Sequence, residues 1–186
     1  MKFDPTKHNR HSIRLPEYDY SQPGAYFVTL VTRGRECLFG DIKDSEMRLN
    51  EAGWVVWDVW NFLPARYPHI KLGAAVVMPN HFHGIVIINN APTGEAIPVR
   101  AIHESPLRGR TTERRRMTLP LVVGYFKMNS ARRINEILDS SGIPVWQRNY
   151  YEHIIRDDEE HNCIHLYIES NIYNWVMDDE NPVKKI

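Results

Sequence analysis

The stretch Val76-Val77-Met78-Pro79-Asn80-His81-Phe82-His83-Gly84-Ile85-Val86-Ile87-Ile88 carries two histidines on either side of one large apolar residue, within a run of β-branched residues. Successive side chains of a β-strand point to opposite faces, so a strand here would place His81 and His83 on one face and Phe82 on the other. Two imidazoles about 7 Å apart along a strand can hold one metal ion. An edge strand with two solvated histidines fits the same short pattern, so the assignment depends on the rest of the chain.

The overall composition is that of a single soluble domain covering residues 1–186. This length suffices for one sizeable core, and 42% apolar with 25% charged residues is ordinary for a soluble globular chain. Cys37 and Cys163 are too few for a disulfide framework and wrongly spaced for a zinc site. The polar, basic N-terminus does not resemble a signal peptide, and no apolar run approaches the roughly 20 residues of a membrane span. We therefore expect a cytoplasmic protein without membrane contact.

Charge is distributed unevenly along the chain, although the formal net charge is zero. From Arg100 to Arg133, nine lysines and arginines stand against two acidic residues. From Asp157 to Ile186, eight acidic residues stand against two lysines. A basic surface of this kind can meet a polyanion such as DNA, although two solvated faces would give the same pattern.

Two segments have the composition of irregular structure. Residues 1–23 hold three prolines and several basic residues and predict an N-terminal arm, whereas residues 91–117 predict a flexible basic loop within the domain. Basic side chains in these segments, and one lysine of the helix expected to follow the loop, could contact a phosphate backbone. The candidate DNA-binding residues are Arg10, Arg14, Arg108, Arg110, Arg114, Arg115, Arg116 and Lys127.

The remaining segments have clear strand or helix patterns. Asn50 is a good helix N-cap, and Pro64 is expected to end that helix. Thr118 is expected to cap the next helix, and Asp157 with Glu160 has the spacing of a capping box. The expected strands cover residues 25–32, 70–78, 81–88 and 145–156, a small hairpin turns at 44–45, and the expected helices cover 50–63, 118–138 and 157–172.

A second pair of polar residues lies on the last expected helix. Tyr167 and Asn171 are four positions apart and therefore share a helix face. A tyrosine can act as a nucleophile once a base or metal favours its phenolate, and an amide oxygen can bind a hard cation. The tyrosine could equally pack on the sheet without chemistry. Tyr150, Tyr151 and Tyr173 are other possible nucleophiles, but none combines helix placement with a matching polar residue one turn later. No glycine-rich phosphate loop, nucleophile elbow or Cys-x-x-Cys pair is present.

Four stretches of the chain resemble one family of DNA-processing enzymes. The run Val77-Met78-Pro79-Asn80-His81-Phe82-His83-Gly84-Ile85 resembles the His-hydrophobic-His, or HUH, strand of single-tyrosine transposases. Three others resemble the REP-associated tyrosine transposase branch: Arg10-His11-Ser12-Ile13-Arg14-Leu15, Trp146-Gln147-Arg148-Asn149-Tyr150-Tyr151-Glu152-His153-Ile154-Ile155-Arg156, and Tyr167-Ile168-Glu169-Ser170-Asn171. The match keeps the family order over most of the chain, so it is far more specific than the histidine pair alone.

The resemblance implies a fold and an activity. The fold would be α+β, with a central antiparallel sheet in the RRM-like or ferredoxin-like manner, helices packed mainly on one face, and a C-terminal helix carrying the nucleophile. The protein would be a metal-dependent endonuclease and strand transferase that acts on hairpin-containing single-stranded DNA, REP-like palindromes included, through a 5′-phosphotyrosine intermediate. Tyr167 would match the nucleophile, and His81, His83 and Asn171 would match the ligands of Mg²⁺ or Mn²⁺.

One departure and several alternatives accompany this interpretation. Relatives in the branch often carry proline directly after the asparagine, where this chain has Ile172. Asn171 is a weak neutral donor, so modest metal affinity is expected. A DNA-hairpin-binding protein that no longer cuts, and a metal-dependent hydrolase without a covalent step, remain alternatives that would need no nucleophilic tyrosine. The wider family uses dimers with a swapped tyrosine helix and the REP-associated branch can act as monomers, so both monomer and homodimer remain open.

Overall fold

The computed structural model describes residues 18–89, 117–178 and 180–182. The arm expected at residues 1–23 is described only from residue 18 onward, and the loop expected at 91–117 lies outside the described residues except for its last position. The candidate DNA-binding residues Arg10, Arg14, Arg108, Arg110, Arg114, Arg115 and Arg116 also lie outside them.

A four-stranded antiparallel sheet forms the centre of the molecule. Its strands are β1 (Gly24–Val31), β4 (Ile70–Val77), β5 (His81–Ile88) and β6 (Tyr151–Ile155), in the spatial order β4-β5-β1-β6. With the helices between them, the main elements follow the β-α-β-β-α-β sequence of the ferredoxin-like fold. The small hairpin of β2 (Gly40–Lys43) and β3 (Glu46–Leu49) turns at Asp44 and Ser45, both at positive φ, as the sequence predicted.

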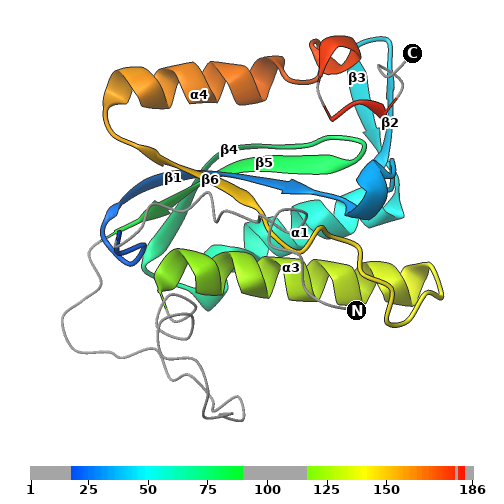
Figure 1. Ribbon diagram of the computed structural model, residues 1–186, viewed down its shortest axis with the longest axis horizontal. Coiled ribbons are helices and arrows are strands. Elements are labelled where there is room, and N and C mark those ends of the chain that lie inside the picture. The colour runs from blue at the N-terminus through cyan, green and yellow to red at the C-terminus, as the bar shows by residue number, and fades with distance from the viewer. Residues whose placement is uncertain (1–17, 90–116, 179, 183–186) are drawn as a thin grey trace, which may run out of the picture.

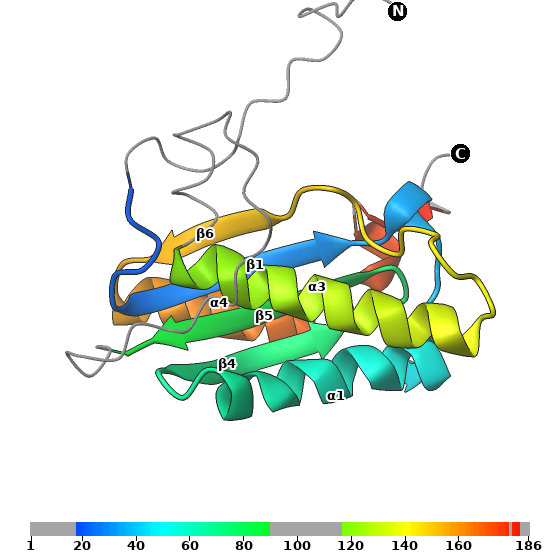
Figure 2. The same ribbon diagram turned by 90° about the horizontal axis from the view of Figure 1, so that it is seen from below.

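The helices lie on both faces of this sheet. Helices α1 (Glu51–Arg66) and α3 (Thr118–Ile137) pack side by side on one face, and α4 (Asp158–Ser170) lies across the opposite face (Figure 1). Seen from below, α1 and α3 cover the sheet together (Figure 2). The expected α+β class with an antiparallel sheet is confirmed, and α4 stands apart from the main helical layer. None of the helices in the described part of the chain combines the length and apolar character that crossing a bilayer requires.

The main core lies between the sheet and the α1/α3 layer. Phe82 is fully buried there, with its ring centroid 4.7 Å from that of Trp60 and 5.1 Å from that of Phe126. Gly84 follows on the same face, and a Cβ atom there would lie 2.7 Å from an indole carbon of Trp60. Phe82 and Gly84 therefore pack the strand β5 closely against the helices, and the two histidines lie on its opposite face.

Two helix boundaries differ from the sequence prediction. Pro64 does not end α1, because only its own N–H is missing and Tyr67 N–H still reaches the Leu63 carbonyl at 2.8 Å. Thr118 is the first residue of α3 rather than its cap, and the N-cap is Met117, which makes no side-chain capping bond. By contrast, the Asn50 cap is confirmed: its side chain accepts from Gly53 N–H at 3.0 Å.

The strand expected over residues 145–156 is shorter in the structure. Only Tyr151–Ile155 forms β6, while Trp146 makes an isolated bridge to Thr32. Between these two points, the Lys127 ammonium donates to the backbone carbonyls of residues 147, 148 and 149, at 2.6, 3.1 and 3.4 Å. The pairing register shifts by two positions between Thr29↔Tyr151 and Thr32↔Trp146, so the ladder is interrupted there and Lys127 bonds to the carbonyls of the interrupted stretch.

Candidate functional site

The two histidines begin β5 directly after its hairpin. The turn at Pro79-Asn80 is closed by a 2.8 Å bond from Met78 N–H to the His81 carbonyl, so the strand starts at His81. His81 is 0% and His83 is 4% exposed, and their ring centroids are 4.6 Å apart on the face that α4 covers. The alternative of a solvated edge strand is therefore wrong, because β5 lies between β4 and β1 and buries both imidazoles.

Asn80 determines which nitrogen of His81 carries the proton. Its amide nitrogen donates to the carbonyls of Arg35 and Glu180, at 3.0 and 2.7 Å. The amide oxygen therefore faces His81 Nδ1, at 2.9 Å, and accepts from it. The proton of the neutral ring is on Nδ1, so the Nε2 lone pair points away from Asn80.

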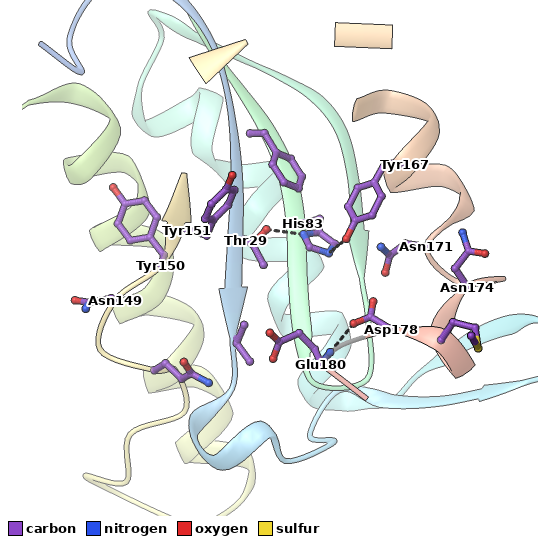
Figure 3. Close-up of a pocket in the computed structure, with 14 residues that line it drawn as sticks. Thr29, His83, Asn149, Tyr150, Tyr151, Tyr167, Asn171, Asn174, Asp178 and Glu180 are labelled. Atoms are coloured by element: carbon purple, nitrogen blue, oxygen red, sulfur yellow. Dashed lines mark hydrogen bonds between the residues drawn. The ribbon is translucent and has the colours of Figure 1, made fainter. Parts of the chain in front are cut away.

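His83 lies between a threonine and the tyrosine of α4. Its Nδ1 is 2.7 Å from Thr29 Oγ1, across the β1–β5 pair, and its Nε2 is 3.5 Å from the Tyr167 hydroxyl (Figure 3). Burial lowers the pKa of His83 well below its usual value, and neighbouring His81 lowers it further. Burial also lowers the pKa of His81 to about 4, against the opposing effects of Asp178 and Asn171. Both rings are therefore neutral at pH 7 and can offer lone pairs to a cation.

Helix α4 positions Tyr167 and Asn171 over the histidines. The helix begins at the Asp157 cap, whose side chain accepts from Glu160 N–H at 2.8 Å, as the capping pattern predicted. Ile168 packs into a small apolar cluster on this face of the sheet. Tyr167 is 47% exposed, with its ring edge-on to His83 at 5.3 Å between centroids. Asn171 follows as the helix C-cap with helical φ/ψ and is 2% exposed, so the two residues share one face as predicted.

Two buried lone pairs in this cluster have no hydrogen-bond partner. They belong to His81 Nε2 and Asn171 Oδ1. An unbonded acceptor in a protein interior costs free energy unless a donor or cation satisfies it. No group of three histidine, cysteine or acidic side chains poised for a metal occurs among the described residues. A cation here would depend on the amide of Asn171 together with the two imidazoles, a donor set that fits Mg²⁺ or Mn²⁺ only weakly.

His83, Tyr167 and Asn171 border a cavity of about 670 Å³ beside α4, whereas His81 does not line it (Figure 3). Tyr150 and Tyr151 line its other side, and Tyr173, which does not line it, is 71% exposed. Tyr167 is thus the tyrosine whose hydroxyl meets an imidazole of the pair. The lining residues are Phe27, Thr29, Val31, His83, Gln147, Asn149, Tyr150, Tyr151, Tyr167, Asn171, Asn174, Met177, Asp178 and Glu180.

Asp178 and Glu180 also line the cavity, although in the sequence they are only part of an acidic C-terminal stretch. They reach the cavity because the chain turns back after α4, and Asn80 bonds to the Glu180 carbonyl across 100 positions. No local spacing pattern signals a contact of this length. His153 and His165 pair with Glu160 and Glu169 at 2.6 and 3.1 Å, and neither histidine lines the cavity.

Comparison with known proteins places this geometry in context. No protein-family model matches the chain. An uncharacterized protein of Haemophilus influenzae is 37% identical over 180 residues, covering 95% of this chain and 96% of the relative. Among solved structures, a REP-associated tyrosine transposase bound to a REP hairpin matches with a TM-score of 0.55 and 17% identity, over 87% of this chain and 73% of that one.

The fold is that of the REP-associated tyrosine transposase, so the resemblance expected from the sequence is confirmed at the level of the fold. The chain belongs to the same family as the Haemophilus influenzae protein, since the two match over nearly their whole lengths.

Proposed function

We propose that the protein is a metal-dependent single-strand DNA endonuclease and strand transferase, a transposase acting on hairpin-containing DNA through a 5′-phosphotyrosine intermediate. One observation carries the proposal: the Tyr167 hydroxyl lies 3.5 Å from His83 Nε2, beside the unbonded His81 Nε2 and Asn171 Oδ1. A protein that only binds DNA needs no tyrosine hydroxyl beside the unbonded lone pairs of His81 and Asn171, which a cation could satisfy.

The metal site would be formed by His81, His83 and Asn171. The Nδ1 atoms of the two imidazoles are held by Asn80 and Thr29, so a cation would take the unbonded Nε2 of His81 and would replace the 3.5 Å contact between His83 Nε2 and the Tyr167 hydroxyl. When bound, Mg²⁺ or Mn²⁺ would supply a Lewis acid that polarises a non-bridging oxygen of the scissile phosphate.

Tyr167 would carry the covalent chemistry. Its hydroxyl oxygen forms a bond to the phosphorus, the bond from phosphorus to the 3′ oxygen breaks, and that oxygen takes a proton from water to leave as a free 3′-OH. Tyr167 is 47% exposed, so its proton can pass to solvent water. Attack by another 3′-OH on the phosphotyrosine reverses the step and joins strands without ATP.

The DNA partner of the site would be a hairpin. The solved transposase of the same fold is bound to a REP hairpin, which supports hairpin DNA as the substrate class. Lys127 would contribute to DNA binding by fixing the segment that carries Gln147 and Asn149 along the cavity wall. The candidate phosphate contacts are Arg10, Arg14, Arg108, Arg110, Arg114, Arg115 and Arg116.

The test is formation of a covalent adduct. The full chain is incubated with 3′-labelled single-stranded oligonucleotides that share one hairpin and carry a randomised flank, with Mg²⁺, Mn²⁺ or EDTA. We expect a labelled protein band that survives denaturing electrophoresis, requires metal, and disappears in Tyr167→Phe while hairpin binding remains. Tyr151→Phe, which alters another tyrosine of the cavity, is the matched control and should keep the adduct.

Two results would change the assignment. An adduct that persists in Tyr167→Phe would move the nucleophile to another residue. Hairpin binding by the native chain without any adduct, under either metal, would favour the alternative of a non-cleaving hairpin-binding protein.

A further inference from the structure

A carboxylate from the C-terminal segment lies next to the unbonded lone pair of His81. After α4, the chain forms the short 3-10 helix η2 (Trp175–Met177) and turns back toward the start of β5. Asp178 Oδ2 is then 3.9 Å from His81 Nε2, and the Asp178 side chain is only 10% exposed. Resting on the function proposed above, we propose that Asp178 is a further ligand of the divalent cation, so that the site comprises His81, His83, Asn171 and Asp178.

The distance between the two atoms suits a shared cation better than a hydrogen bond. At 3.9 Å the nitrogen and the oxygen are too far apart for a hydrogen bond. Two ligands on opposite sides of one Mg²⁺ ion, each about 2.1 Å from it, are about 4.2 Å apart, and ligands at smaller angles are closer. One ion can therefore bridge both atoms once the side chains adjust, since no three histidine, cysteine or acidic groups are already gathered for a metal among the described residues.

Charge balance also favours an additional acidic ligand. A histidine binds a metal through its neutral ring, and the amide of Asn171 is also uncharged, so these three groups bring no negative charge to a buried dication. Mg²⁺ and Mn²⁺ favour carboxylate oxygens, whereas neutral imidazoles suit transition metals such as Zn²⁺. Asp178 supplies the missing anion, which removes the weakness expected of a site built on Asn171 alone.

The C-terminal segment is built to hold this carboxylate in place. Asp178 Oδ1 accepts from the backbone N–H of Glu180 at 2.7 Å, which leaves Oδ2 directed toward His81. The Glu180 carbonyl in turn accepts from Asn80 at 2.7 Å, and the Glu180 carboxylate pairs with Arg35 at 3.0 Å. Asn80 therefore fixes both the tautomer of His81 and the segment that presents Asp178.

If Asp178 occupies the position of a DNA phosphate instead of binding metal, removing its charge has the opposite effect. Asp178 borders the cavity and could take the place of a DNA phosphate there instead of binding the cation. Removing its charge would then strengthen DNA binding and leave metal affinity unchanged. If Asp178 is instead a metal ligand, removing its charge weakens metal binding.

The experiment measures metal binding to the full-length protein without DNA. Isothermal titration with Mg²⁺, Mn²⁺ and Zn²⁺ compares the native chain with Asp178→Asn, which keeps the shape of the side chain and removes its charge. Asp158→Asn is the matched control, since it removes the same charge from the exposed first turn of α4. Circular dichroism and the Tm without metal establish that each variant is folded, and Asp178→Glu tests whether a restored carboxylate recovers affinity.

We expect Asp178→Asn to weaken Mn²⁺ binding roughly 10- to 100-fold, by analogy with the loss of groups that support a metal site. The loss should be greatest for Mg²⁺ and least for Zn²⁺, while Asp158→Asn binds as the native chain does. Equal Mn²⁺ affinity in Asp178→Asn and native protein would overturn the proposal without affecting the adduct test of Tyr167. Absence of Mn²⁺ binding by the native chain would overturn the metal site itself and this inference with it.

Discussion

The side-chain amide of Asn80 donates a 2.7 Å hydrogen bond to the backbone carbonyl of Glu180, a residue 100 positions later in the chain. Its oxygen meanwhile accepts from His81 Nδ1 at 2.9 Å. Asn80 is fully buried, so neither contact is exchanged for water. One side chain thus joins the hairpin that begins the histidine strand to the segment that follows α4.

Replacing Asn80 should therefore lower both the stability of the protein and the metal affinity of the site. Asn80→Ala removes three hydrogen bonds, to His81 Nδ1 and to the carbonyls of Arg35 and Glu180, so we expect a loss of about 0.5–1.5 kcal/mol in the free energy of unfolding for each. Mn²⁺ affinity should also fall, roughly 10- to 100-fold, because His81 is free to change tautomer. Urea unfolding and calorimetric titration measure the two effects. A loss of stability without a loss of affinity would show that the His81 tautomer does not depend on Asn80.

The buried histidines should make the metal-free protein sensitive to acid. The pKa of His81 is lowered from 6.5 to about 4, and that of His83 is lowered in the same direction. The unfolded chain therefore binds more protons than the folded protein below pH 6.5. The stability that the neutral histidines allow is fully present above pH 6.5 and is lost as the pH falls toward 4. The expected slope for each histidine approaches about 1.4 kcal/mol per pH unit in that window.

Urea unfolding in EDTA at pH 7.5, 6.0 and 5.0 measures this dependence. His81→Gln removes one of the two groups, so its stability should fall less between pH 7.5 and 5.0 than that of the native chain. Parallel curves for the two proteins would mean that His81 is protonated in the folded state at the same pH as in the unfolded chain.

Gly84 should tolerate no side chain. A Cβ atom would lie 2.7 Å from Trp60 and 2.9 Å from Phe82, both buried rings of the main core. We expect Gly84→Ala to lower the free energy of unfolding by about 1–3 kcal/mol, as overpacking of a core does. Gly124→Ala is the control: nothing lies within 4 Å of its added Cβ, and alanine in the interior of α3 should stabilise by about 0.5–1 kcal/mol. Thermal unfolding should show a lower Tm for Gly84→Ala and a higher Tm for Gly124→Ala, and equal changes in Tm would contradict the prediction.

The sheet, the histidine face and the tyrosine helix could all be predicted from the sequence because each depends on local periodicity. Strand and helix periods are local, so the alternation around Phe82 and the four-residue spacing of Tyr167 and Asn171 could be read without tertiary information. The family resemblance then connected the two elements. Their proximity is now observed directly, at 3.5 Å between the Tyr167 hydroxyl and His83 Nε2.

The parts that could not be predicted depend on contacts between distant segments. The 145–156 strand is shortened where its pairing with the first strand shifts by two positions, and Lys127 of α3 bonds to the carbonyls of that stretch. No strand pattern encodes a side chain that comes from a helix. Asp178 enters the site through the bond between Asn80 and Glu180. In the sequence it is one acidic residue among several near the C-terminus.

Thr29 should act on the metal site through His83 rather than through stability alone. Its hydroxyl lies 2.7 Å from His83 Nδ1, so it fixes the ring orientation that directs Nε2 toward Tyr167. Thr29→Val keeps the shape of the side chain and removes the hydroxyl. We expect Mn²⁺ affinity to fall roughly 10- to 100-fold and the metal-dependent adduct to decrease with it.

A second threonine separates this effect from the general cost of losing a buried hydroxyl. Thr32 is fully buried and its hydroxyl donates to the Glu36 carbonyl at 2.8 Å, not to a histidine. Thr32→Val should lower the free energy of unfolding by about 1 kcal/mol and leave Mn²⁺ affinity at the native value. If both variants lose stability but neither loses affinity, His83 is held by its packing against Phe27, whose ring centroid is 5.3 Å away, and not by Thr29.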